Sequence, residues 1–194
     1  MQARVRSTNV ARPKPEPAGR RYLTGIDKRP VAAIEVFEPG PVYGDGPGVV
    51  GDHVGDVQHH GGAQKAVYAY AREELDWWQE QLGAELPYGV FGENLRTIGL
   101  DVNAARVGEV WRIGDTVLGA VTHPRRPCQT FARWLAEQGI VSERGWVRRF
   151  GEERRLGPYL RVLRTGRVQA GDPIEVVEVP AGAPGLLDGW EPRD

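Results

Sequence analysis

The chain has 194 residues, which is enough for one ordinary domain with a hydrophobic core. Its formal net charge of -1 provides no broad positive field for nucleic acid or an anionic membrane, and no apolar run is long enough to cross a bilayer. One cysteine cannot form an internal disulfide, and the polar N-terminus lacks the hydrophobic core of a signal peptide. We therefore expect a cytoplasmic protein with no nucleic-acid partner and no membrane partner.

The first half of the chain predicts short strands and one helix. Three prolines make residues 12–19 look loose. Short β-branched or aromatic runs bounded by glycine or proline predict strands over 31–37 and 66–70. Apolar residues at helical spacing, acidic residues in the first turn and a stop at Gly83 predict a helix over 73–82.

The second half alternates hairpins with short helices. A hairpin is predicted over 107–121, turning at Gly-Asp, and a second over 159–179, turning at Ala-Gly-Asp. Helices are predicted over 130–138 and 142–150, the second with a serine N-cap. Many short strands with few helices indicate a mainly β (α+β) fold, a closed or nearly closed β-barrel. We expect one domain over residues 1–180 and a loose tail over 181–194.

The only cysteine, Cys128, lies in a basic loop, within the segment His-Pro-Arg-Arg-Pro-Cys-Gln-Thr. A lone cysteine is often a buried small hydrophobe. Here two arginines and the first turn of the helix expected from residue 130 favour the thiolate, which attacks electrophiles or binds soft metals. Cys128 is therefore the candidate catalytic residue and metal ligand.

A second candidate segment, His-His-Gly-Gly-Ala-Gln-Lys, begins at His59. It could be a simple turn with solvated histidines. Alternatively, the bare amides of Gly61 and Gly62 could approach a phosphate, with Lys65 adding charge. A zinc site is a third interpretation, but adjacent histidines in an extended chain point to opposite faces, which disfavours a shared metal for His59 and His60.

Taken in order, six blocks of the sequence resemble the MOSC domain, the C-terminal module of molybdenum cofactor sulfurases, and especially its stand-alone bacterial members. Together they cover roughly residues 20–175 in the family's order. The blocks are residues 24–31, 50–62, 65–70, 91–95, 125–128 and 159–172.

The resemblance implies a β-barrel that holds a molybdenum cofactor (molybdopterin), with the Cys128 thiolate as a ligand to molybdenum. The residues that would line the cofactor pocket are His60, Gly61, Gly62, Lys65, Asn94 and Arg125. The implied activity is an oxidoreductase that reduces N-hydroxylated bases or amidoximes as small-molecule substrates. No flavin, haem or iron-sulfur ligand set is visible, so electrons would come from a separate reductase.

Two other functions stay open at this point. The chain could be a non-catalytic carrier of the cofactor, or of sulfur as a Cys128 persulfide. It could also be a cofactor-free thiol enzyme with Cys128 as nucleophile and a histidine as base. The pyridoxal-dependent desulfurase domain of full cofactor sulfurases is expected to be absent, as is the helical extension that follows the barrel in some stand-alone reductases. A homodimer also stays open.

Overall fold

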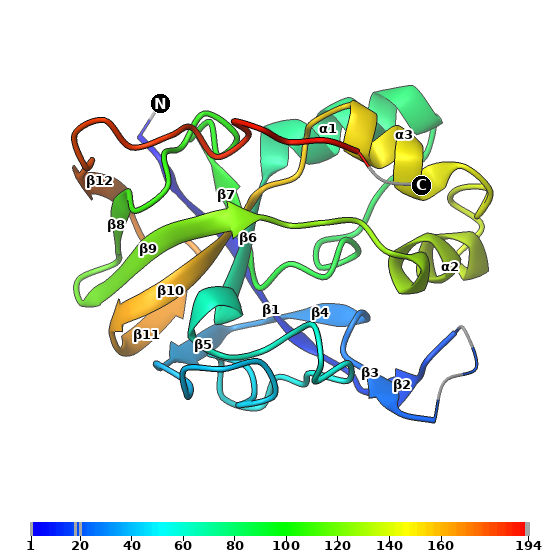
Figure 1. Cartoon of the computed structure of the whole chain (residues 1–194), viewed down its shortest axis with the longest axis horizontal. Helices are drawn as coiled ribbons and strands as arrows, with labels where there is room; N and C mark the ends of the chain where they lie inside the picture. Colours follow the sequence, from blue (N-terminus) through cyan, green and yellow to red (C-terminus); the bar gives the residue numbers. More distant parts are fainter. Residues whose placement is uncertain (1, 18, 20, 193–194) are drawn as a thin grey trace.

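The computed structural model describes residues 2–17, 19 and 21–192. These residues form a mainly β, α+β structure with three α-helices, which Figure 1 shows gathered beside the strands. The strands are β1 (Arg4–Ala11), β2 (Lys14–Pro15), β3 (Leu23–Thr24), β4 (Lys28–Val31), β5 (Ala33–Val36), β6 (Val67–Ala71), β7 (Leu95–Ile98), β8 (Val110–Ile113), β9 (Val117–Pro124), β10 (Pro158–Arg164), β11 (Gly166–Gln169) and β12 (Ile174–Glu178). The helices are α1 (Arg72–Leu82), α2 (Gln129–Glu137), α3 (Trp146–Glu152) and a short 3-10 turn, η1 (Ala63–Lys65).

Eight strands form the main sheet in the order β12-β8-β9-β10-β6-β7-β1-β4, and β11 pairs separately with β5. All of its pairings are antiparallel except that of β6 with β7. The start of β1 also contacts the turn before β12, where the Val5 amide donates to Asp172 O at 2.8 Å. The prediction of a mainly β fold is therefore confirmed. Among the described residues no ladder joins β4 to β12, so strand pairing does not establish the predicted closure into a barrel.

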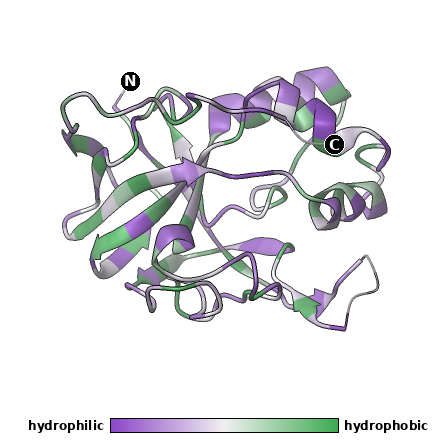
Figure 2. Cartoon of the chain, in the orientation of Figure 1, coloured by the Kyte–Doolittle hydropathy of each residue, from purple (hydrophilic) through white to green (hydrophobic). Residues whose placement is uncertain are grey.

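Two hydrophobic cores pack on the two sides of β6. Aliphatic side chains, most of them on the strands, form the first core together with Trp111. The second is aromatic and lies among the helices, where Trp78 stacks on Phe150 at 5.2 Å between ring centroids. Figure 2 shows hydrophobic colour along β8, β9 and β10, and hydrophilic colour on much of α1 and α3. None of the helices in the described residues is long and apolar enough to cross a bilayer.

Several predicted elements are confirmed and others are wrong. The hairpin β8–β9 turns at 114–116 as expected. The predicted hairpin over 159–179 is wrong, because β11 pairs with β5 and β12 pairs with β8. The predicted strand over 31–37 bends at Ala32 and contributes to two sheets. The third helix begins at Trp146, since Gly145 adopts a left-handed φ of 77° that ends the preceding loop.

Both chain ends differ from expectation. The polar N-terminal segment forms β1, which the sequence did not predict, and β2 pairs with β3 where a loose segment was expected. The predicted loose tail is wrong for residues 181–192, because Leu186 and Trp190 are buried and the Trp190 indole donates to Gly151 O at 3.0 Å. Residue 18 and residues 193–194, also predicted to be loose, lie outside the described residues.

Candidate functional site

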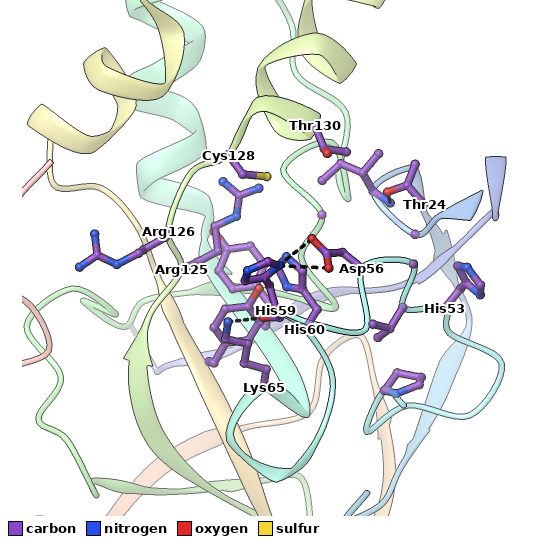
Figure 3. A pocket seen from close by; sticks show the side chains of 18 of the residues that line it. Thr24, His53, Asp56, His59, His60, Lys65, Arg125, Arg126, Cys128 and Thr130 are labelled. Carbon is purple, nitrogen blue, oxygen red and sulfur yellow. Dashed lines mark hydrogen bonds and ion pairs between the residues drawn. The ribbon is translucent and has the colours of Figure 1, made fainter. Parts of the chain in front are cut away.

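One pocket collects the chain's reactive side chains. It encloses about 640 Å³, within the ordinary range for small-molecule and cofactor sites. All four histidines and the only cysteine line it: His53, His59, His60, His123 and Cys128 (Figure 3). Of the seven residues predicted for the site, the structure brings five to this pocket, namely Cys128, His60, Lys65, Asn94 and Arg125.

Cys128 is the N-cap residue of α2, close to the predicted position in the first helical turn. Its backbone is extended, with φ -142° and ψ 170°, and its carbonyl accepts the Ala132 amide at 3.1 Å. The side chain is half-buried and forms no cap hydrogen bond. The helix therefore presents this sulfur beside its free N-terminal amides, which favour an anion.

Arg125 is a buried cation without a full set of partners. Only 5% of the residue is exposed, and its guanidinium lies 4.0 Å from the centre of the Phe131 ring. Its Nη1 has no hydrogen-bond partner among the residues that the structure describes. A buried donor left unpaired is costly, so this side chain fits an anionic ligand that would complete its hydrogen bonds.

Lys65 and two histidines lie on the same side of the pocket. The 3-10 turn η1 places Lys65, whose Nζ donates to His59 O at 2.6 Å and lies 4.7 Å from the centre of the Tyr43 ring. Burial, with the charge of Lys65 nearby, lowers the pKa of His60 to about 4 and that of His123 to about 4. Both imidazoles are therefore neutral near pH 7, and the positive charge resides on Lys65 and the arginines.

A buried ion pair that was not predicted for the site, Lys28 with Asp52, also lines the pocket. Lys28 Nζ donates to Asp52 Oδ1 at 2.6 Å, and Asp52 also accepts from Asn94 Nδ2 at 2.8 Å and the Ala11 amide at 2.9 Å. Burial alone would raise the pKa of Asp52, but Lys28 and these donors lower it below its ordinary value. Lysine occurs only three times in the chain, and both Lys28 and Asp52 lie in blocks of the sequence that resemble the MOSC domain. The rarity of lysine was therefore the one feature of the sequence that could have pointed to Lys28 as a site residue.

Asn94, predicted to contact the cofactor, uses its amide mainly within the protein. Besides the bond to Asp52, its Nδ2 lies 3.3 Å from Asn9 O and its Oδ1 accepts the Tyr68 amide at 3.2 Å. Asn94 lines the pocket, but it supports Asp52 and the strands around it.

Gly61 and Gly62, also predicted for the site, are not among the residues that line this pocket. Both have left-handed backbones, with φ 80° and 74°. The Gly62 amide already donates to Gly46 O at 2.9 Å, and a Cβ on Gly62 would come within 2.1 Å of Val42 O. These glycines are therefore needed for the close approach of the 42–46 loop, and the Gly62 amide is not available to a phosphate.

A second pair in the pocket joins Asp56, which is partly buried, to the exposed His59. The Asp56 carboxylate lies 3.0 Å from His59 Nδ1 and accepts the Gln58 amide at 3.2 Å. Burial alone would raise the pKa of Asp56, but the hydrogen bond and charge of His59 lower it below its ordinary value. Asp56 is therefore a carboxylate at neutral pH. Within the described residues, no three side chains of histidine, cysteine, aspartate or glutamate form a group that could hold a metal ion.

The family model of the MOSC domain matches residues 56–175. The match covers more than half of the chain, so this protein belongs to the MOSC domain family.

Relatives of known sequence include two bacterial proteins and one fungal protein. Uncharacterized protein YflK of Bacillus subtilis is 33% identical over 174 residues, covering 89% of this chain and 72% of its own. A protein named Reductase from Gibberella moniliformis is 32% identical over 147 residues, but this chain spans only 24% of its length. Protein YiiM of Escherichia coli is 28% identical over 142 residues, covering 67% of this chain and 56% of its own.

Solved structures show the same fold. YiiM from Geobacillus stearothermophilus matches with a TM-score of 0.71 and 28% identity, covering 95% of this chain and 80% of its own. The YUAD protein from Bacillus subtilis matches with a TM-score of 0.65 at 17% identity, which concerns the fold alone. The resemblance of the sequence to the MOSC domain family is thus confirmed.

Proposed function

We propose that this chain binds a molybdenum cofactor in the 640 Å³ pocket and reduces N-hydroxylated bases or related N-oxygenated compounds. The observation that carries the proposal is that the only thiol, Cys128, shares the pocket with Arg125, whose buried Nη1 is unpaired among the described residues. A soft sulfur donor suits molybdenum, and an unpaired guanidinium suits the phosphate of a pterin cofactor. Membership of the MOSC family and the likeness to a protein named Reductase agree with this proposal.

The residues present fit such a group. Cys128 would be the protein ligand to the metal, while Arg125 and Lys65 would hold the phosphate. When bound, the cofactor supplies a two-electron redox centre. The neutral His60 and His123 can accept or donate hydrogen bonds beside these cations without adding repulsion. Electrons would come from a separate reductase.

The test begins with protein purified fresh from a host that makes the cofactor. We expect about one molybdenum and one pterin per chain, and turnover of an N-hydroxylated purine with a viologen as reductant. Molybdenum and pterin without turnover would support the cofactor carrier instead. Protein with neither, but with a Cys128-dependent thiol activity, would support the cofactor-free enzyme.

Cys128→Ser gives the matched variant. It replaces a soft anionic donor with a hard, protonated one at nearly the same volume, so turnover should be lost while thermal unfolding stays unchanged. A serine variant with wild-type turnover would contradict both the ligand and the nucleophile role of Cys128.

A further inference from the structure

We propose that His59, held in place by Asp56, is the catalytic acid of this pocket and protonates the oxygen that leaves the substrate. The inference rests on the proposed reduction of N-hydroxylated compounds. Asp56 is then a positioning residue that acts through the imidazole.

The reaction needs two protons as well as two electrons. A hydroxylamine R–NH–OH takes two electrons from the external reductant, its N–O bond breaks, and the products are R–NH₂ and water. One proton goes from His59 to the departing hydroxide, which leaves as water. The other proton goes from solvent to the nitrogen. A positioned acid for the first transfer avoids expelling free hydroxide as the leaving group.

The pair has the geometry of an oriented acid. Both carboxylate oxygens of Asp56 lie 3.0 to 3.1 Å from His59 Nδ1 (Figure 3). A carboxylate only accepts hydrogen bonds, so Nδ1 carries a hydrogen and Nε2 is the ring atom left for the substrate. The His59 side chain is 68% exposed, so water can reprotonate it after each turnover.

The other three histidines are less suited to this role. His60 and His123 are neutral because burial lowers the pKa of each to about 4, with Lys65 adding to the shift. His53 Nε2 lies 2.9 Å from Leu23 O, a carbonyl that cannot stabilise an imidazolium as a carboxylate does. The charged and titratable groups that line the pocket with His59 come from several segments. They are Tyr22, Lys28, Tyr43, Asp52, His53, Asp56, His60, Lys65, Tyr68, His123 of β9, Arg125, Arg126, Cys128 and Tyr159.

Turnover of loaded variants tests the proton transfer. His59→Gln keeps a polar side chain but cannot act as an acid, so turnover should fall about 10²- to 10⁴-fold with molybdenum and pterin content unchanged. His59→Ala should lose as much, and added imidazole should restore part of the rate because the site is open to water. Asp76→Asn, which removes an exposed carboxylate paired with Arg72 on α1, is the control and should behave as wild type.

A second readout needs no cofactor. In cofactor-free protein, nitrogen NMR should find the Nδ1 hydrogen on neutral His59, and Asp56→Asn should lose this tautomer preference and slow turnover in the loaded enzyme. Wild-type turnover in His59→Gln, or a neutral His59 with its hydrogen on Nε2, would overturn the inference and leave the proposed function standing. If the wild type holds cofactor yet reduces no N-hydroxylated compound, the proposed function fails and this inference fails with it.

Discussion

Two parts of the pocket lining, which we call its matched side and its unmatched side, hold their charges differently. On the matched side Lys28 is paired with Asp52, and neither side chain is more than 8% exposed. On the unmatched side only 5% of Arg125 is exposed, yet among the described residues its Nη1 has no partner and no carboxylate lies within ion-pair distance of Lys65. A buried charge that is paired with an opposite charge is compatible with a stable fold. A buried charge without such a partner lowers the free energy of unfolding, and the binding of an anion raises it again.

The largest expected effect is on the matched side. Lys28→Met would leave Asp52 buried without its cation, so we expect a loss of about 3–5 kcal/mol in the free energy of unfolding, measured by urea titration of cofactor-free protein. The control is Lys14→Met, which makes the same change in an exposed pair with Glu137 and should cost no more than about 1 kcal/mol. An equal loss of unfolding free energy in Lys28→Met and Lys14→Met would contradict the claim that the buried pair differs from an exposed one.

On the unmatched side, the effect should fall on ligand affinity. A charge-assisted hydrogen bond to phosphate contributes roughly 1.5 to 3 kcal/mol, so Lys65→Ala should weaken cofactor binding about ten- to a hundredfold. Burial and the nearby Arg125 already lower the pKa of Lys65, which shows that the free pocket disfavours this charge. Pterin per chain, measured for wild type and variant, decides the matter. An unchanged pterin content in Lys65→Ala would contradict a role of Lys65 in binding the cofactor.

A further effect concerns the dependence of stability on pH. His60 and His123 have a pKa of about 4 in the folded protein and about 6.5 when unfolded, so the unfolded chain binds more protons between these values. Their contribution to stability is therefore complete above pH 6.5 and is lost as pH falls toward 4. Urea midpoints measured from pH 7 to pH 4.5 should decline, and His60→Gln should flatten the decline. A midpoint that rises on acidification would contradict the neutral assignment of both histidines.

The cysteine loop shows what the sequence could predict. Prolines, arginines and a short helical pattern are local features, and they placed Cys128 within one residue of its position at the N-cap of α2. The hairpin β8–β9 could also be predicted, because its turn and both of its strands are contiguous in the sequence.

Features set by distant contacts were missed. β1 carries Thr8 and Asn9 at fully buried positions, and these polar side chains are satisfied by Val31 O and Glu93 O, far away in the sequence. The sequence alone does not reveal these partners, so the segment was interpreted as a polar terminus. The Lys28–Asp52 pair spans 24 residues and was missed as a pair for the same reason. Trp190 likewise needs α3 beside it before the tail can be recognised as packed.

The most direct test of the account compares Arg125→Gln with Lys28→Met in cofactor-free protein, by the free energy of unfolding. Removing Arg125 gives up a cation–π contact with Phe131 worth about 1–2 kcal/mol. It also removes a buried guanidinium whose Nη1 has no hydrogen-bond partner among the described residues. We expect Arg125→Gln to lie within about 1 kcal/mol of wild type and Lys28→Met to be several kcal/mol less stable. A loss in Arg125→Gln as large as that in Lys28→Met would contradict the claim that this side of the pocket is built for an anionic ligand.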